Sequence, residues 1–405
     1  MSTAHEVEAH LGSNDTIELF KRYVIGNYNR YPVNLVRGEG SFVWDAEGNR
    51  YLDFFPGWGC NLLGHCPVPV VQAVQEQVAT LIHVPNTWHM DAQGRWAQML
   101  SERSFGGQAF FCNSGAEANE AAIKLARLHG KGRYKIITFL GGFHGRTLGA
   151  LTATAQPKYH EGLGPLVAGF QYAPYGDAEA AKKLIDEETC AIMVEPIQGE
   201  GGIKIPPAAF LPALRKLCDE HGLLLILDEV QTGCGRTGDW FAYQQSGITP
   251  DVMTLAKALC GGIAGGAMLA TPAVAPYLKP GTHAATFGGN PIAARAGIAT
   301  LEMIEQEGLL ENAKQLGQIF ARRFAALQKE CDVIREVRVR GVMVGLELLV
   351  PGAAVVKECL AKKLLVNCTH DTVIRLLPAM NLSEELAEEG CDVLAQVIRD
   401  LPRAA

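Results

Sequence analysis

The stretch LLLILDEVQTG at 223–233, followed by DVMTLAKALCGG at 251–262, decides the fold. Its apolar run at 223–227 is too short to span a membrane and is typical of a buried parallel strand. That run ends in Asp228, and a second apolar run at 252–256 ends in Lys257. Because ligands bind at the carboxyl ends of strands in open α/β sheets, both side chains are expected in one site.

An aspartate and a lysine at the ends of two such strands suit a site for pyridoxal 5′-phosphate. In such a site the lysine forms a Schiff base with the cofactor, and the aspartate keeps the pyridinium nitrogen protonated. The alternative is that Asp228 and Lys257 are ordinary surface residues. Either residue alone favours that alternative, so the interpretation depends on the rest of the chain.

The composition is that of a globular enzyme. The 405 residues are 48% hydrophobic and 20% charged, enough for one large domain and a smaller one. The net charge of -7 offers no basic surface for nucleic acid or anionic lipid. No apolar run approaches the roughly 20 residues of a membrane span, and the polar opening at 1–10 is not a secretory signal.

The cysteines and one glycine motif exclude other classes of site. The 11 cysteines are scattered, odd in number and without a CxxC pair, and the 11 histidines show no metal-ligand spacing. This pattern indicates reduced thiols in a cytoplasmic protein rather than disulfides or a zinc site. The match to GxGxxG at 233–238 is no dinucleotide fingerprint, because no helical pattern follows it and no acidic residue ends a suitable second strand.

The clearest helix start in the chain lies at Ser114. A short apolar run at 109–112 precedes Ser114, and Glu117 follows three residues later, which is the pattern of a capping box. The free N–H groups at such a helix start, after Ser-Gly, suit the binding of a phosphate. The alternative is a well-capped helix without a ligand.

Two glycine-rich turns present aromatic residues. The turn at 141–142 precedes Phe143 and His144, with Arg146 behind them. Phe143 could stack on a flat cofactor ring and Arg146 could bind a carboxylate bidentately, or they could be a core Phe and a surface Arg. The turn at 57–64 could carry Trp58 into a pocket, or could be a packed connection.

The apolar runs predict a parallel α/β sheet with a smaller domain. Runs at 134–140, 190–195 and 223–228 end in polar residues and are separated by helical patterns. We predict a large domain over 61–305 and a smaller α+β domain built from 1–60 and 306–405. In the latter, Arg375 lies in an apolar strand and needs a carboxylate partner.

Together the motifs closely resemble the class III (fold type I) pyridoxal phosphate-dependent aminotransferases, and most of all the acetylornithine aminotransferases. Any one motif is weak, but the whole set in this order is highly specific, and it covers about residues 30–400. The motifs are FCNSGAEANEAAIKLAR (111–127), FHGRTLGALTATAQPKY (143–159), VEPIQGEGG (194–202), CDEHGLLLILDEVQTGCGRTG (218–238), TLAKAL (254–259), PGTHAATFGGNP (280–291), GLLENA (308–313) and LLVNCTHDTVIRLLP (364–378).

The resemblance implies how the cofactor is held. Lys257 is similar to the Schiff-base lysine and proton shuttle of the family, and Asp228 to the partner of the pyridine nitrogen. Thr286 would reach the phosphate of a neighbouring subunit, which implies an obligate homodimer. The other cofactor-binding residues that the resemblance implies are Ser114, Gly115 and Ala116 at the phosphate, Phe143 and Val230 on the two ring faces, Gln231 at the phenolic oxygen, and His144.

The resemblance also implies how the two substrates, a small amino acid and 2-oxoglutarate, are bound. Arg146 would bind the α-carboxylate of the amine donor, and Arg375 that of glutamate or 2-oxoglutarate. Glu200 would pair with Arg375 while the other substrate occupies the site. An ω-amine substrate then passes with the pair closed and glutamate opens it, in a ping-pong double displacement.

The implied activity is transfer of the ω-amino group of N-acetylornithine to 2-oxoglutarate, giving N-acetylglutamate semialdehyde and glutamate for arginine biosynthesis. The nearest alternatives are other ω-aminotransferases, acting on ornithine, 4-aminobutyrate, succinyldiaminopimelate or a lysine-pathway substrate. An intramolecular aminomutase is disfavoured because both Arg146 and Arg375 are present with Glu200. A non-catalytic, pyridoxal phosphate-binding regulatory protein is disfavoured because Lys257 and Asp228 are both kept.

The chain departs from the family pattern near the site, which leaves the acyl-group preference open. Ala264 replaces a proline, Cys260 replaces a glycine, and His89 stands where an aromatic residue is usual. Near the position of Trp58, ornithine aminotransferases tend to carry a tyrosine that meets the free α-amine of the substrate. The indole of Trp58 can donate a hydrogen bond but cannot accept one. Our hypothesis is that Trp58 disfavours a free ammonium and tolerates an acylated amine. Equal turnover of ornithine and N-acetylornithine would contradict it.

Overall fold

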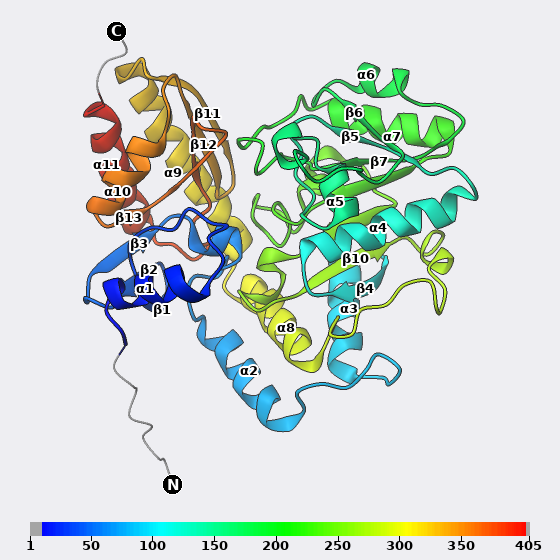
Figure 1. The fold of residues 1–405 in the computed structure, drawn as a ribbon, viewed down its shortest axis with the longest axis horizontal. Coiled ribbons are helices and arrows are strands. Elements are labelled where there is room, and N and C mark those ends of the chain that lie inside the picture. The colour runs from blue at the N-terminus through cyan, green and yellow to red at the C-terminus, as the bar shows by residue number, and fades with distance from the viewer. Residues whose placement is uncertain (1–9, 402–405) are drawn as a thin grey trace.

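The computed structural model describes residues 10–401, arranged as a larger and a smaller part with their own β-sheets (Figure 1). The prediction about the opening residues concerns mainly 1–9, which lie outside the described residues. Within 10–401, no helix is both long and apolar enough to cross a membrane.

The larger part contains a seven-stranded sheet in the order β4-β10-β9-β8-β7-β5-β6. The pairs from β9 to β6 are parallel, which confirms the predicted parallel sheet. Only β10 runs antiparallel to its neighbours, because residues 256–265 are too few for a crossover connection after β9. The strands are β4 (Gln108–Cys112), β5 (Lys135–Phe139), β6 (Phe170–Ala173), β7 (Thr189–Val194), β8 (Leu224–Asp228), β9 (Val252–Leu255) and β10 (Gly266–Ala270).

Helices cover both faces of this sheet. Side chains alternate along a strand, so Leu224 and Ile226 pack with α4 on one face, while Leu225 and Leu227 pack with α7 on the other. This double burial explains the continuous apolar run of β8. The helices of this part are α2 (Val68–Thr80), α3 (Asp91–Arg103), α4 (Gly115–Gly130), α5 (Leu148–Ala153), α6 (Ala178–Lys183), α7 (Phe210–His221) and α8 (Pro291–Gln306), with 3-10 turns η1 (Pro56–Gly59), η2 (Pro157–Tyr159), η3 (Ala242–Ser246), η4 (Lys257–Cys260) and η5 (Ala275–Tyr277).

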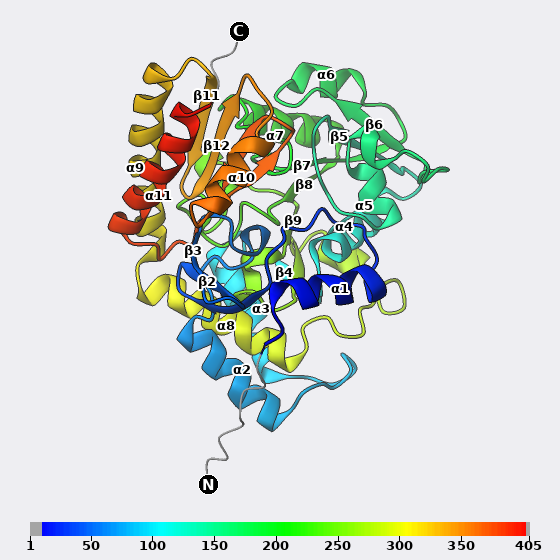
Figure 2. The ribbon, with the colours of Figure 1, turned by 60° about the vertical axis from the view of Figure 1, so that its left-hand side comes forward.

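The smaller part joins the two ends of the chain. Strands β1 to β3 form a meander, and β3 pairs in parallel with β13, with Leu52 opposite Leu364. Figure 2 shows these N-terminal strands beside the C-terminal sheet and its helices. The domain boundaries at 60 and 305 stay a prediction. The elements are α1 (Ser13–Tyr23), β1 (Leu35–Glu39), β2 (Phe42–Asp45), β3 (Arg50–Asp53), α9 (Leu309–Glu330), β11 (Ile334–Arg340), β12 (Met343–Leu348), α10 (Ala353–Ala361), β13 (Leu364–Leu365), β14 (Asn367–Thr369), β15 (Val373–Leu376) and α11 (Glu384–Arg399).

A glycine separates α8 from the long helix α9. Helix α9 begins at Leu309, because Gly308 has φ of +61°. Glycine adopts this left-handed conformation at little cost, so it ends one helix and begins the next. The final helix, α11, has Ser383 as its N-cap, since the Ser383 hydroxyl accepts from the N–H of Leu386.

Trp96 on α3 anchors the packing between α3, α8 and the sheet. It is fully buried, and its ring stacks on Phe111 with the centroids 4.2 Å apart. We expect Trp96→Ala to lower the free energy of unfolding by about 3–5 kcal/mol, because it leaves a large cavity. Urea unfolding would measure this, with exposed Gln98→Ala on the same helix as the control, expected within about 0.5 kcal/mol of wild type. Equal effects of both changes would contradict the assignment.

Candidate active site

A cavity of about 430 Å³ lies where β7, β8 and β9 end. Its volume falls within the range of small-molecule sites, about 300–1,000 Å³. The sequence-predicted residues that line it are Ser114, Gly115, Ala116, Phe143, His144, Arg146, Glu200, Asp228, Val230, Gln231 and Lys257.

Lys257 enters this cavity from η4, directly after β9. Its φ of +48° lies in the left-handed region, which is uncommon for a residue with a side chain and costs free energy. Burial lowers the pKa of Lys257, although the charge of Glu200 partly opposes the shift. A lysine with a depressed pKa holds more of its amine uncharged and ready to attack a carbonyl carbon.

Asp228, the last residue of β8, is almost fully buried and held in one orientation. Its Oδ2 accepts from Asn119 Nδ2 at 2.8 Å and bonds His144 Nδ1 at 2.7 Å, and its Oδ1 accepts from the N–H of Val230 at 3.0 Å. Asn119 Oδ1 in turn accepts from the hydroxyl of Thr254 at 2.7 Å. This hydrogen-bond network fixes the orientation of the Asp228 carboxylate at the cavity wall. Asn119 was not predicted from the sequence as a site residue. Its signal is an amide among the buried alanines of α4.

His144 and Glu195 lie behind Asp228 and are both buried. Burial disfavours the charged imidazole, but the hydrogen bond and charge of Asp228, with the charge of Glu195, outweigh it and raise the pKa of His144. Burial raises the pKa of Glu195 to about 7. Glu195 accepts from the N–H of Phe143 at 2.8 Å and of Gly199 at 3.1 Å, so it joins the Phe143 turn to the loop that carries Glu200.

The start of α4 forms one end of the cavity. Ser114 is its N-cap and accepts from the N–H of Glu117 at 3.2 Å, as predicted. In place of the reciprocal bond of the capping box, the N–H of Asn113 donates to Glu117 Oε2. The first N–H groups of the helix keep no intrahelical partner, which makes this end an anion site. A Cβ on Gly115 would lie 2.8 Å from Val230 Cγ1, so only glycine fits there.

Arg375 on β15 finds its predicted carboxylate in Glu200. Its Nη1 donates to Glu200 Oε1 at 2.6 Å, and its Nη2 donates to Asn367 Oδ1 at 2.9 Å. Burial raises the pKa of Glu200, but the charges of Arg375 and Lys257 outweigh it, so that the net pKa is lowered. Arg375 is fully buried and reaches the cavity through Glu200, which lines it. Opening this ion pair would release a guanidinium for another carboxylate.

Of three further predicted residues, one lines the cavity and two do not. Arg146 lines it, with its guanidinium 3.9 Å above the centre of the Tyr159 ring. Trp58 does not line it, being 54% exposed beside Tyr28. Thr286 is exposed in the segment before α8 and does not line it either. The structure of the single chain therefore brings neither Trp58 nor Thr286 to the other site residues.

The departures from the family pattern also have places in the structure. Ala264 lines the cavity, in the glycine-rich loop at 261–266. Cys260 is buried, and a Cβ on Gly265 would lie 2.4 Å from its sulfur. His89 is exposed and does not line the cavity. Of these three residues, only Ala264 lies where it can contact a ligand in the cavity.

The residues around the cavity fit pyridoxal 5′-phosphate. An amine, a fixed carboxylate and an anion-binding helix start surround one space of suitable volume. Gln231 Oε1 is buried without a hydrogen-bond partner among residues 10–401, as expected of a group whose partner is a ligand. Within the same residues, no cluster of three or more His, Cys, Asp or Glu side chains could hold a metal ion.

Glu229, next to Asp228, points away from the cavity and accepts from the N–H groups of Ala242 at 3.0 Å and Tyr243 at 2.8 Å. Burial raises the pKa of Glu229 to about 7 from the usual 4.5. A carboxyl whose pKa is higher in the folded state contributes stability that is complete below its unfolded pKa and is lost as the pH rises through about 7.

We therefore expect the melting temperature of the wild type to fall between about pH 4.5 and pH 7, and to fall less in Glu229→Gln. The pKa values of Glu195 and His144 are also raised in the folded state, so these residues too make stability fall as the pH rises. The variant should therefore remove only part of the dependence of the melting temperature on pH. Differential scanning fluorimetry measures it, with exposed Glu188→Gln as the control. An unchanged slope in Glu229→Gln would contradict the prediction.

Comparison with known proteins gives one consistent family. Residues 23–398 match the family described as Aminotransferase class-III. An acetylornithine aminotransferase of Caldanaerobacter subterraneus subsp. tengcongensis is 50% identical over 387 residues, covering 94% of this chain and 98% of that protein.

Solved structures of the same kind share the fold. An ornithine aminotransferase from Toxoplasma gondii has a TM-score of 0.93 at 30% identity and covers 96% of each chain. An acetylornithine aminotransferase from Elizabethkingia anophelis has a TM-score of 0.87 at 31% identity, covering 97% of this chain and 100% of that chain. The likeness therefore extends over both parts of the structure.

Proposed function

Because the chain belongs to the class III aminotransferases and is thus a pyridoxal phosphate-dependent enzyme, we propose that it transfers the terminal amino group of N-acetylornithine to 2-oxoglutarate. The products are N-acetylglutamate semialdehyde and glutamate. The 50% identity to an acetylornithine aminotransferase supports the choice of donor. The observation that carries the proposal is the closed pair of Arg375 and Glu200 beside Lys257.

The cofactor, when bound, supplies an electron sink for the electrons released at the substrate carbon that bears the amine. The start of α4 would bind its phosphate, and Asp228 would keep its ring nitrogen protonated through a charge-assisted hydrogen bond. Phe143 and Val230 would hold its ring, Gln231 would bond its phenolic oxygen, and His144 holds Asp228 in place.

Lys257 moves the proton. Its Nζ accepts the proton from the carbon that bears the substrate's amine, and acts as the acid in the opposite direction of the reaction. Burial favours this role, because it lowers the pKa of Lys257. In each half of the reaction the same side chain therefore serves as base and then as acid.

The Arg375–Glu200 pair lets one site accept two unlike substrates in turn. With the pair closed, the guanidinium is neutralised, and N-acetylornithine binds by its own carboxylate at Arg146. Glutamate and 2-oxoglutarate carry a second carboxylate, which competes with Glu200 for the fork of Arg375. Exchange between the two partners of Arg375 gives the ping-pong order.

We expect Glu200→Ala to slow the half-reaction with N-acetylornithine by about tenfold, because a loss of about 1.4 kcal/mol follows when Arg375 is left uncompensated. The half-reaction with glutamate should change by less than about threefold. Stopped-flow absorbance of the bound cofactor measures both, with exposed Glu188→Ala as the control. Equal slowing of both half-reactions would contradict the role of the pair.

We also propose a cytoplasmic homodimer in which Thr286 reaches the phosphate site of the partner. Its exposure outside the cavity of its own chain supports this role. Large exposed apolar residues gather in the N-terminal segment and near residues 81–88, as at protein interfaces. They include Tyr23, Ile25, Tyr28, Ile82 and Trp88. Sedimentation should give a dimer, and Thr286→Ala should weaken cofactor binding in that dimer; a monomer with full cofactor affinity would contradict it.

The decisive test of the substrate is a half-reaction without acceptor. The enzyme is loaded with cofactor and given N-acetylornithine, ornithine or 4-aminobutyrate separately, while its visible absorbance is followed. We expect fast conversion to the pyridoxamine form with N-acetylornithine, reversed by 2-oxoglutarate. Faster conversion by another donor would contradict the substrate, and no conversion by any donor would contradict the catalytic role. The same comparison tests the hypothesis about Trp58.

A further inference from the structure

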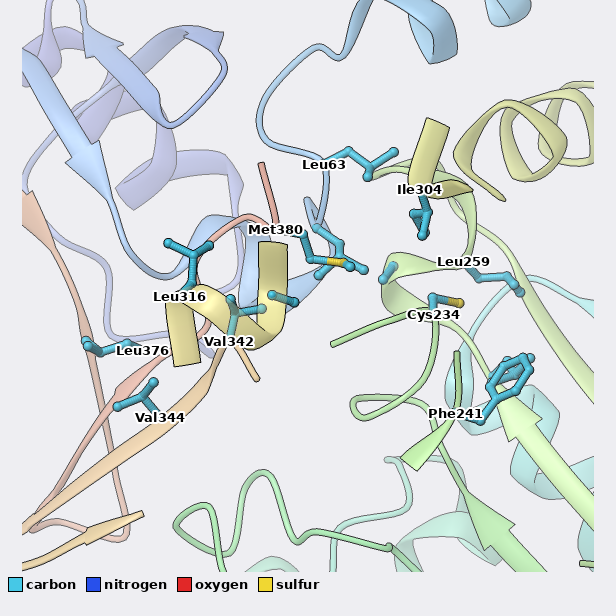
Figure 3. Close-up of a cluster of buried hydrophobic side chains, with 14 of the residues drawn as sticks. Leu63, Cys234, Phe241, Leu259, Ile304, Leu316, Val342, Val344, Leu376 and Met380 are labelled. Carbon is cyan, nitrogen blue, oxygen red and sulfur yellow. The ribbon is translucent and has the colours of Figure 1, made fainter. Parts of the chain in front are cut away.

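The GxGxxG match at 233–238 joins the two parts of the structure. It forms consecutive turns after β8 and begins no helix. A Cβ on Gly235 would lie 2.7 Å from Met380 Cε, and one on Gly238 would lie 2.6 Å from Lys314 Cγ. The glycines therefore allow close approach of C-terminal segments, and Figure 3 shows Met380 between Val342 on one side and Cys234 on the other.

Arg236 lies at the centre of this junction and has no exposed surface. Its Nη1 donates to the carbonyl oxygens of Leu377 at 3.0 Å and Pro378 at 2.7 Å, and its Nη2 donates to that of Gly59 at 2.9 Å. Within residues 10–401 no carboxylate pairs with it. Burial lowers the pKa of Arg236 to about 9, so it stays charged at neutral pH. Burying a cation without a counter-charge costs stability. A gain in stability alone therefore does not explain why Arg236 lies at this position.

Two of the three carbonyl contacts of Arg236 lie directly after β15, the strand that carries Arg375. Leu377 follows Arg375 by two residues, directly after β15. The carbonyl of Arg236 also accepts from the N–H of Val342 at 3.0 Å, next to β12. Strand β12 pairs with β15 and places Gly345 opposite Arg375. The side chain of Arg236 thus bonds to residues directly after β15, and its backbone carbonyl bonds to the residue directly before β12.

We propose that Arg236 is a positioning residue for the glutamate half of the reaction: it sets the place of Arg375 relative to Glu200 and the cavity. This rests on the proposed role of Arg375 as the binder of a substrate carboxylate. A purely structural role would lower stability and slow both half-reactions alike. A positioning role changes the binding of dicarboxylates and spares the half-reaction with N-acetylornithine.

The test compares Arg236→Lys with wild type. Lysine keeps the charge but cannot hold three carbonyls in the fork geometry of a guanidinium. We expect the KM for 2-oxoglutarate and the Kd of glutarate, measured by calorimetry, to rise at least about tenfold. The half-reaction with N-acetylornithine should stay within about threefold of wild type. Gly235→Ala should act in the same direction, because its Cβ would press on Met380 without touching the guanidinium.

The matched control is Arg215→Met, which also removes a largely buried arginine, one paired with Asp251 in the larger part. Equal loss in both half-reactions, or the same selective pattern in Arg215→Met, would overturn the proposal. Unchanged glutarate binding in Arg236→Lys and Gly235→Ala, when Arg375→Ala abolishes it, would also overturn it. Absence of glutarate binding in the wild type would instead contradict the proposed role of Arg375, so the two failures are distinguishable.

Discussion

Turnover is expected to fall by about 10⁴-fold when Lys257 is replaced by alanine, the upper end of what a positioned acid–base group contributes. Among residues 10–401 no second lysine lines the cavity, and the arginines at or near it, Arg146 and Arg375, carry guanidinium groups in place of a primary amine. The variant should still bind the phosphate through α4, but without the covalent bond to Nζ. Steady-state kinetics and the mass of the borohydride-reduced protein measure the two effects.

The control for this change is Lys216→Ala, since Lys216 is an exposed residue of α7 remote from the cavity. It should turn over like wild type and keep the cofactor mass after reduction. Retention of that mass in Lys257→Ala would mean that another lysine holds the cofactor and would contradict the assignment.

The second large effect is expected at Asp228. In Asp228→Asn the ring nitrogen loses its charged partner and His144 loses its carboxylate. Breaking a buried charged pair costs about 3–5 kcal/mol. If that cost falls on the transition state, the rate drops by about 10²–10⁴-fold. The drop should be in kcat for both half-reactions, because both depend on the protonated ring nitrogen, and stopped-flow spectroscopy separates them.

Asp251→Asn is the matched control. Asp251 lies just before β9, at the amino end of the strand and so at the end opposite the cavity. There it accepts from Arg215 and from the N–H of Leu225, each at 2.8 Å. Its loss should lower the melting temperature and leave kcat nearly unchanged. A comparable drop in kcat for both variants would mean that Asp228 acts through stability alone.

The sequence was sufficient to predict where the central strands of the large sheet end. Apolar runs followed by polar residues predicted where β7, β8 and β9 stop, and the direction of parallel strands then predicted that Asp228 and Lys257 share a cavity. The local signal at Ser114 was sufficient as well, because a cap depends on residues within one turn. The pairing of Arg375 with a carboxylate followed from the cost of burying a lone charge.

What depends on contacts distant in sequence could not be predicted. Asn119 and Thr254 meet near Asp228 only because α4 packs on β8 and β9. The amide among the alanines of α4 marks Asn119 as unusual, but it does not indicate which residues Asn119 contacts. The contacts of Arg236 with Gly59 and Leu377 join residues 177 and 141 positions apart. Trp58 and Thr286 do not line the cavity in the structure of one chain, so their predicted roles stay predictions.

The parallel pairing of β3 with β13 has a consequence for the chain while it is being made. Strand β3 is complete soon after synthesis begins, but its partner at Leu364 follows about 310 residues later. At about 5–20 residues per second, the edge of β3 waits roughly 15–60 s on the ribosome without its neighbour. Over that interval the growing chain exposes an unpaired strand edge, the surface that chaperones bind and that aggregation begins from.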